Sequence, residues 1–378
     1  MQMSGYFDNC ATTKPCERAI LRMNQVTQNT WGNPSSLYDF GVTSENLLQQ
    51  AREKISDIIF CRTDEVFFTS GGTEANNIAV FGTAKALARR GKRIVTTAIE
   101  HASVIEPINE LEQQGFEVIR LPVDKNGQVN EADINAAITR DTILVSMMLI
   151  NNETGAIADI PAISRAIKAV GAPALLHCDC VQAFMKMPFK MNTLGADLIT
   201  ISAHKIHGVA GVGALIKRKG AHILPHTFGG SQESAVRPGT QSVALIAAFL
   251  GAMENMKSED KAIQNMQSYT KEKLIKMQGI KINSPENASP YIINISVSGI
   301  RSETMLHFLE AKGIYISSGS ACSKGKGSYV LKETGLNQND IDSAIRISFS
   351  HNNNTDEIDA LCDGIYEATQ KLTRRIVI

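Results

Sequence analysis

The sequence of 378 residues contains no long hydrophobic run and no excess of charge of either sign. No apolar stretch approaches the ~20 residues that a membrane-spanning helix needs. The first residues combine neither a basic region nor an apolar core, so we expect neither membrane association nor a secretory signal peptide. Lysine plus arginine and aspartate plus glutamate both number 38, which gives a formal net charge of zero. We therefore expect no nucleic acid as a direct partner.

Cysteine is also scarce, with seven in the chain. An odd count without a secretory signal predicts reduced thiols in a cytoplasmic protein, of which at least one could be reactive. Cys178 and Cys180 flank Asp179 in a segment that has the pattern of a strand. Because neighbouring residues of a strand point to opposite faces, we expect two buried small side chains there and no metal site.

Strand and helix patterns alternate from about residue 43 to residue 217. A helix is expected over 43–59, with Ser44 as its N-cap. The expected strands that follow lie at 66–69, 93–99, 116–121, 142–150, 174–178, 198–201 and 213–216. This alternation predicts an α/β fold whose large domain has a central, mostly parallel sheet sandwiched by helices. Ligands of such sheets bind at the carboxyl ends of the strands.

A polar run at 257–260 marks the expected domain boundary. Beyond it, helical and strand patterns continue on a smaller scale and end in a helix over about 355–371. We therefore predict a large domain over 14–257. A smaller α/β domain would be formed by 1–13 and 258–378.

Lys205 directly follows one of the predicted buried strands. A buried ammonium costs free energy unless it is paired or neutralised, and a Schiff base with an aldehyde cofactor neutralises it. Lysine suits this chemistry because burial lowers its pKa readily. Alone, the residue would more simply be a surface lysine after a strand, so the other polar residues at the strand ends decide the interpretation.

Pyridoxal 5'-phosphate needs a Schiff-base lysine, a carboxylate at its ring nitrogen, a phosphate cradle and a group against its ring. Lys205 and Asp179 would supply the first two. His101 would stack on the ring, and Gln182 could reach the phenolic oxygen. A glycine-rich turn before a helix presents free N–H groups to an anion, although it is also a common tight turn. The phosphate would be held by Gly72, Thr73, Ser202 and His204.

Seven motifs, in the same order and over nearly the whole chain, resemble those of the cysteine desulfurases. These are pyridoxal-phosphate enzymes of fold type I in the class V aminotransferase group. The motifs are TSGGTEANN at 69–77, EH at 100–101, NNETG at 151–155, DCVQ at 179–182, SAHK at 202–205, RPGT at 237–240 and SGSAC at 318–322.

The resemblance implies an enzyme that converts L-cysteine to L-alanine and leaves the sulfur as a persulfide on Cys322. The sulfur would pass to an acceptor protein in iron–sulfur cluster assembly or tRNA thiolation. Lys205, released from the cofactor, would move the Cα proton with His101 as acid/base partner. The lysines that follow Cys322 could lower the pKa of its thiol.

The resemblance also assigns binding residues and an oligomeric state. Arg346 and Asn152 would bind the substrate carboxylate, since an arginine fork suits that bidentate contact; Asn152 would also contact the cofactor. The family forms homodimers in which the residue at Thr240 reaches the phosphate of the partner subunit.

The sequence departs from the family at several points that leave the details open. Tyr38 stands where a histidine is common, the loop after Cys322 is shorter than in the housekeeping branch, and that branch's longer C-terminal tail is absent. The sulfur acceptor is therefore not defined. The alternatives are a selenocysteine lyase or an aminotransferase of the same group, or a non-catalytic scaffold on the same fold. A scaffold would have no use for Lys205, Asp179 and Arg346 together.

Overall fold

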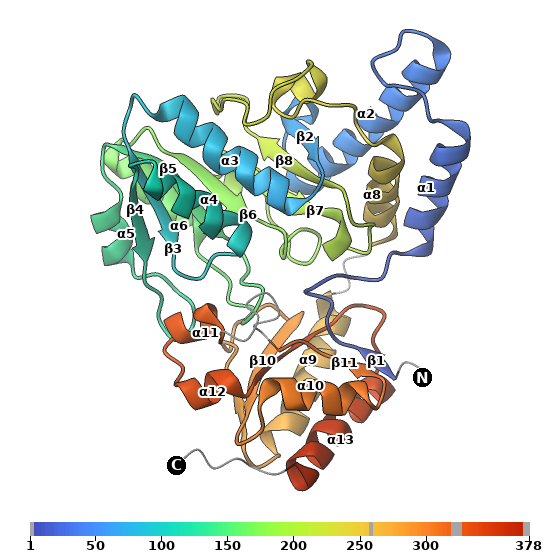
Figure 1. Ribbon diagram of the computed structural model, residues 1–378, viewed down its shortest axis with the longest axis vertical. Helices are drawn as coiled ribbons and strands as arrows, with labels where there is room; N and C mark the ends of the chain where they lie inside the picture. The colour runs from blue at the N-terminus through green and yellow to red at the C-terminus, as the bar shows by residue number, and fades with distance from the viewer. Residues whose placement is uncertain (1–3, 257–259, 319–326, 373–378) are drawn as a thin grey trace.

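The computed structural model of the protein describes residues 4–256, 260–318 and 327–372. They form two units, which lie one above the other in Figure 1. The upper unit is built on a seven-stranded sheet with the strand order β2-β8-β7-β6-β5-β3-β4, in which β8 runs antiparallel to both of its neighbours. Its strands are β2 (Val66–Thr69), β3 (Arg93–Thr97), β4 (Glu117–Leu121), β5 (Thr142–Met148), β6 (Leu175–Asp179), β7 (Leu198–Ser202) and β8 (Gly213–Lys217).

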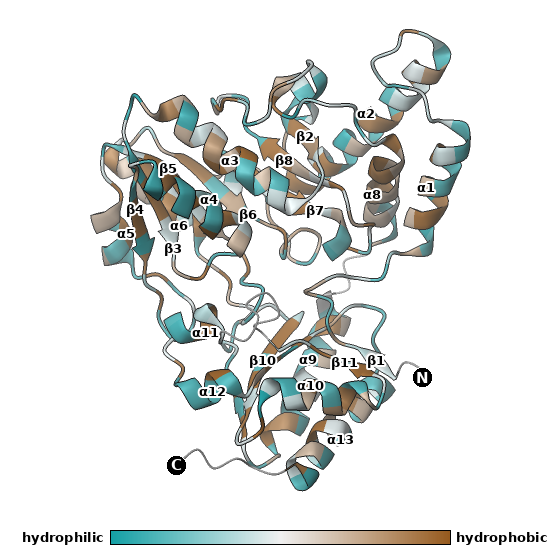
Figure 2. Cartoon of the chain, in the orientation of Figure 1, coloured by the Kyte–Doolittle hydropathy of each residue, from teal (hydrophilic) through white to brown (hydrophobic). Residues whose placement is uncertain are grey.

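Helices cover both faces of this sheet, as the alternating sequence pattern predicted. One face packs against α3 (Gly72–Leu87) and α4 (Ala102–Gln113), and the other against α2 (Asp39–Ile59), α6 (Ile160–Val170) and α8 (Val243–Asn255). In Figure 2 the strands inside the sheet are mostly hydrophobic. Strands such as β5 and β7 can be largely apolar because both of their faces are buried. The expected mostly parallel, helix-covered sheet is confirmed.

The first helices of the chain differ from the sequence-based expectation. Ser44 is not an N-cap, because α2 begins at Asp39 and its N-cap is Tyr38. The Ser44 hydroxyl instead donates to the Phe40 carbonyl at 3.1 Å, a bond that a serine inside a helix can make one turn back. The helix α1 (Glu17–Asn29) was not expected at all. It buries only two of its residues, so its apolar stripe is too narrow to stand out in the sequence.

The lower unit is a smaller α/β assembly. Its antiparallel sheet has the order β12-β10-β9, and a second, parallel pair joins β1 (Gly5–Tyr6) to β11 (Ile314–Tyr315). The sheet strands are β9 (Ile280–Ile282), β10 (Ile292–Val297) and β12 (Ala344–Ser348). Its helices are α9 (Asp260–Ile275), α10 (Ser302–Glu310), α11 (Tyr329–Glu333), α12 (Gln338–Asp342) and α13 (Thr355–Lys371). The N-terminal strand thus pairs with the C-terminal part of the chain. The exact domain boundaries, between residues 13 and 14 and between residues 257 and 258, remain a prediction.

The segment after β1 crosses from the lower unit to the upper one and carries the start of the functional site. Asp8 forms an isolated bridge with Ser348 in the lower unit. Five residues later, the Thr13 N–H donates to the His204 carbonyl at 2.9 Å in the upper unit. Residues 10 and 11 between these two anchors are therefore held against the end of β7.

The described cysteines are free thiols, and two of them are close neighbours. Cys178 and Cys180 are fully buried, with their sulfur atoms 3.5 Å apart. Within the described ranges, no group of three or more His, Cys, Asp or Glu side chains is arranged to hold a metal ion. None of the helices in the same ranges combines the length and apolarity needed to cross a membrane.

Candidate active site

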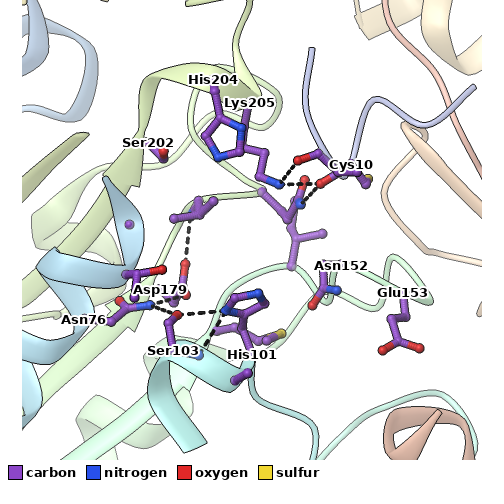
Figure 3. A pocket seen from close by; sticks show the side chains of 18 of the residues that line it. Cys10, Asn76, His101, Ser103, Asn152, Glu153, Asp179, Ser202, His204 and Lys205 are labelled. Atoms are coloured by element: carbon purple, nitrogen blue, oxygen red, sulfur yellow. Dashed lines mark hydrogen bonds between the residues drawn. The ribbon is translucent and has the colours of Figure 1, made fainter. Parts of the chain in front are cut away.

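A cavity of about 390 Å³ opens at the carboxyl ends of β5, β6 and β7, between the two units (Figure 3). Ten of the twelve residues singled out from the sequence line it. They are Gly72, Thr73, His101, Asn152, Asp179, Gln182, Ser202, His204, Lys205 and Arg346. Thr240 is exposed and does not line the cavity, and Cys322 lies outside the described residues.

Lys205 ends a short 3₁₀ turn, η2 (Ala203–Lys205), that directly follows β7. Its Nζ donates to the carbonyl oxygens of Cys10, at 2.5 Å, and Ala11, at 2.8 Å. The pKa of this amine is lowered to about 8, mainly by burial; the charges of Lys186 and Arg346 act in the same direction, and Cys10 and Asp8 oppose them. Near pH 8 about half of Lys205 is therefore the neutral amine, the form that attacks an aldehyde.

Asp179 is the last residue of β6 and is held by two donors. The Val181 N–H donates to its Oδ1 at 2.9 Å, and the Asn76 amide donates to its Oδ2 at 2.8 Å. Asn76 lies one helical turn after Gly72 on α3, so it faces the cavity from the same side of the helix. Asn76 was not expected to be a site residue, although its i, i+4 spacing from the glycine-rich turn was a usable signal.

His101 is the N-cap of α4, and its ring is oriented by that role. Nδ1 accepts the Ser103 N–H at 3.1 Å and lies 2.8 Å from the Ser103 hydroxyl, which itself accepts from Asn76 at 2.8 Å. Burial lowers the His101 pKa, and the charge of Lys205 lowers it further, while Asp179 opposes both. The neutral ring therefore accepts at Nδ1 and carries its proton on Nε2.

The start of α3 has the features of a phosphate cradle. Gly71 adopts φ 155° and ψ −177°, a conformation open to glycine, and a Cβ added to Gly72 would come within 2.8 Å of Val181 Cγ2. The Ser202 hydroxyl opposite is buried and has no hydrogen-bond partner in the described part of the chain. An unsatisfied buried hydroxyl and the free N–H groups of a helix start both fit an anion bound between them.

Gln182 reaches the cavity from the turn after β6. Its amide nitrogen donates to the Cys10 carbonyl at 3.0 Å, and its amide oxygen accepts from Lys186 at 3.2 Å. Lys186 does not line the cavity, and no feature of the sequence had singled it out.

Arg346 enters the cavity from β12 of the lower unit. Its side chain is 7% exposed, and it donates to the Asn152 carbonyl at 2.9 Å and to Asp8 Oδ1 at 2.8 Å. Its Nε is buried and lacks a partner among the described residues. A guanidinium that lines the cavity and retains unused N–H donors is suited to bind a carboxylate.

Comparisons with known proteins identify the family. The family described as aminotransferase class-V matches residues 5–361. A NifS/IcsS protein homolog of Lactobacillus delbrueckii subsp. bulgaricus is 41% identical over 97% of this chain and 98% of its own. A cysteine desulfurase IscS of Dictyoglomus turgidum is 40% identical over 85% of this chain and 83% of its own. The chain belongs to the cysteine desulfurase family.

A solved structure confirms the expected fold of this family member. A NifS-like protein superposes with a TM-score of 0.92 at 34% identity, covering 97% of this chain and all of that one. The resemblance seen in the motifs thus extends to the arrangement of both units.

In this cysteine desulfurase family member, two contacts hold α11 against the upper unit, just after residues 319–326. The Ser328 hydroxyl, the N-cap of α11, donates to Glu153 Oε2 at 2.5 Å, and the Tyr329 hydroxyl donates to the Glu100 carbonyl. Burial raises the pKa of Glu153 to about 7. Glu153 lies beside Asn152 in the NNETG motif, so the start of α11 is tied to the cavity wall.

Thr240 also has a defined position outside the cavity. It is exposed and lies after the turn η3 (Gln232–Ala235). Its loop is fastened to α3, because Arg237 Nε donates to Glu74 Oε1 at 3.1 Å. Tyr38, the departure from the family pattern, is likewise 62% exposed and does not line this cavity.

Proposed function

We propose that this protein is a cytoplasmic, pyridoxal-phosphate-dependent cysteine desulfurase that converts L-cysteine to L-alanine and carries the sulfur as a persulfide on Cys322. The observation that carries the proposal is a single cavity that holds a buried lysine of lowered pKa together with Asp179 and the guanidinium of Arg346. The two-unit fold supports it, since the lysine comes from one unit and the arginine from the other.

The cofactor would be held by groups that already point into the cavity. Asp179 would bind the ring nitrogen, Gln182 the phenolic oxygen, and His101 would lie against the ring. Ser202 and the N–H groups at the start of α3 would bind the phosphate, together with Gly72, Thr73 and His204. When bound, pyridoxal phosphate withdraws electrons from the substrate's Cα and so acidifies its proton.

The remaining groups would handle the substrate. Arg346 would bind the carboxylate of L-cysteine through guanidinium N–H groups that its bonds to Asp8 and Asn152 leave unused, with Asn152 beside it. Lys205 would take up the Cα proton, because a neutral amine is available near pH 8. The neutral His101 ring can donate from Nε2 to the reacting groups.

Sulfur transfer would then use Cys322 as the nucleophile. Its thiolate attacks the substrate sulfur, an S–S bond forms, and the Cβ–S bond of the substrate breaks. The bonding electrons remain on the three-carbon skeleton, which takes up protons and leaves as alanine. The persulfide sulfur would pass to an acceptor protein of iron–sulfur cluster assembly or tRNA thiolation.

A homodimer is part of the proposal. Several large apolar side chains are exposed on α1, α2 and their connection, a surface that a second copy would cover: Ile20, Leu21, Trp31, Leu37, Tyr38, Phe40 and Val42. Leu37 is 97% exposed and Trp31 is 70% exposed. Thr240, which does not reach its own cavity, would contact the phosphate in the cavity of the partner. Sedimentation analysis should give twice the chain mass of 41.0 kDa.

The deciding experiment measures sulfide and alanine released from L-cysteine with a reductant, for the wild type and for Cys322→Ser. Equimolar products, lost in Cys322→Ser while the cofactor absorbance persists, would support the proposal. Cys61→Ser is the matched control, because Cys61 is away from the cavity and burial raises its thiol pKa to about 12. Equal release by the wild type and by Cys322→Ser would favour a lyase, with selenocysteine as the substrate to test. No release despite bound cofactor would favour an aminotransferase.

A further inference from the structure

Lys186 is a buried lysine without a carboxylate partner. Lys186 is 6% exposed and does not line the cavity. No ion pair joins its ammonium to an acidic side chain among the described residues. Its ammonium contacts Gln182 Oε1 at 3.2 Å and lies 5.6 Å from the centre of the Tyr291 ring. Burying an unpaired ammonium is costly, so the fold is stable despite this residue and not because of it.

The contact with Gln182 fixes which way the amide faces. An ammonium can only donate hydrogen bonds, so the oxygen of Gln182 must point to Lys186 and its nitrogen must point away. That nitrogen donates to the Cys10 carbonyl at 3.0 Å, the same carbonyl that accepts from Lys205. Lys186 is thus connected to Lys205 through one side chain and one carbonyl group.

We propose that Lys186 is a positioning residue of the cofactor site, whose buried ammonium orients the Gln182 amide toward the cofactor and places a positive charge behind Lys205. The inference rests on the proposed function, because it takes Lys205 as the cofactor lysine. It deepens that function by assigning a role to a residue outside the cavity.

Electrostatics support the second part of the proposal. The charge of Lys186 lowers the pKa of Lys205, and it also lowers those of His204 and His207. The other charged or titratable groups that act on Lys186 are the Cys10 thiol and Arg346. Burial lowers the pKa of Lys186 itself, while its hydrogen bond to the Gln182 amide oxygen favours the charged form.

The test compares Lys186→Met with the wild type and with Lys190→Met, the same substitution four residues later at an exposed side chain. In apo protein, the pH dependence of Lys205 reductive methylation is followed by mass spectrometry. Cofactor dissociation is measured separately by absorbance. A rise of the Lys205 pKa from about 8 to about 9 reduces its neutral fraction at pH 8 from about one half to about one tenth, so we expect methylation about fivefold slower in Lys186→Met.

We also expect the dissociation constant for pyridoxal phosphate to be about five- to tenfold higher in Lys186→Met, because the Gln182 amide is no longer held in one orientation. Lys186→Gln, which retains a donor without the charge, should slow methylation but retain most of the affinity. Lys186→Gln also provides the test of the proposal if Lys186→Met does not fold.

Three results would overturn the inference: unchanged Lys205 methylation and cofactor affinity in the Lys186 variants, equal changes in Lys190→Met, or a lower unfolding temperature as the only change. The last would indicate a purely structural lysine. A wild-type protein that binds no pyridoxal phosphate would instead refute the proposed function, so the two failures are distinguishable.

Discussion

Asp8 and Arg346 form a salt bridge of 2.8 Å that joins the N-terminal crossing segment to β12 at the wall of the cavity. The two residues are 338 positions apart in the chain. The carboxylate of Asp8 holds one arm of the guanidinium, and the Asn152 carbonyl holds the other. The guanidinium is therefore held in place, which would reduce the ordering cost of binding a carboxylate, the role proposed for Arg346.

Replacing Asp8 should destabilise the protein. Asp8→Asn leaves the nearly buried charge of Arg346 without its ionic partner. Because Asp8 itself is 22% exposed, the free energy of unfolding should fall by about 1–3 kcal/mol, less than for a fully buried pair. Urea unfolding at pH 7.5 measures this change. Asp64→Asn is the control, because Asp64 pairs with Arg62 on the surface and its removal should cost at most about 1 kcal/mol. Equal losses in the two variants would contradict the special role of the Asp8 pair.

Replacing Arg346 should affect the substrate more than the cofactor. Arg346→Lys retains the charge but loses the planar fork, so we expect KM for L-cysteine to rise roughly 10- to 100-fold. Cofactor absorbance should be unchanged, since Arg346 is proposed to bind the carboxylate. Steady-state kinetics of alanine release give the answer, with Arg62→Lys as a surface control. An unchanged KM would exclude Arg346 as the carboxylate ligand.

Although the edge strand β4 is partly exposed, the sheet could be predicted almost strand by strand because most of its strands are buried on both faces. Such strands are short, continuous apolar runs that end at polar residues, as at Asp179 and Ser202. Those polar ends converge because parallel strands share one edge, so the cavity residues could also be grouped from the sequence. Ser44 was wrongly expected to be the N-cap of α2. The apolar pattern defines the start of a helix only to within several residues, and the N-cap depends on that start.

The partners of the site residues could not be predicted in the same way. Asp8 meets Arg346, and Lys186 supports Gln182, through contacts that exist only once the two units and the crossing segment are in place. A local sequence pattern does not indicate which residues will form such pairs. The same holds for Glu153, whose partner Ser328 is 175 residues away.

Asn76 should matter for cofactor binding although it was not expected from the sequence. Asn76→Ala removes a hydrogen bond to the Asp179 carboxylate and the donor to Ser103 that helps to orient His101. We expect the dissociation constant for pyridoxal phosphate to rise roughly tenfold, since hydrogen bonds to charged groups contribute about 1.5–3 kcal/mol. Absorbance titration of apo protein measures it. Asn77→Ala removes only a bond to the helix backbone and should bind the cofactor normally; a similar loss in both variants would indicate general damage to α3.

Glu153 should make the stability of the protein depend on pH. Its pKa is raised to about 7 in the folded state, so between roughly pH 4.5 and 7 the native protein holds a proton that the unfolded chain has lost. The contribution of Glu153 to stability is therefore greatest below pH 4.5 and falls as the pH rises through 7.

Glu153→Gln should remove this slope, because a neutral amide can still accept from Ser328 and does not ionise. Relative to the wild type, the variant should gain roughly 2–3 kcal/mol of unfolding free energy between pH 5 and pH 8. Urea unfolding at the two pH values measures the gain, and Glu110→Gln, at an exposed carboxylate, should show no such change. Ser328→Ala separates charge from anchoring, since it leaves the carboxyl in place but removes its donor. If the difference between wild type and Glu153→Gln is the same at both pH values, Glu153 ionises normally, and its bond to Ser328 is the contact of an ordinary carboxylate.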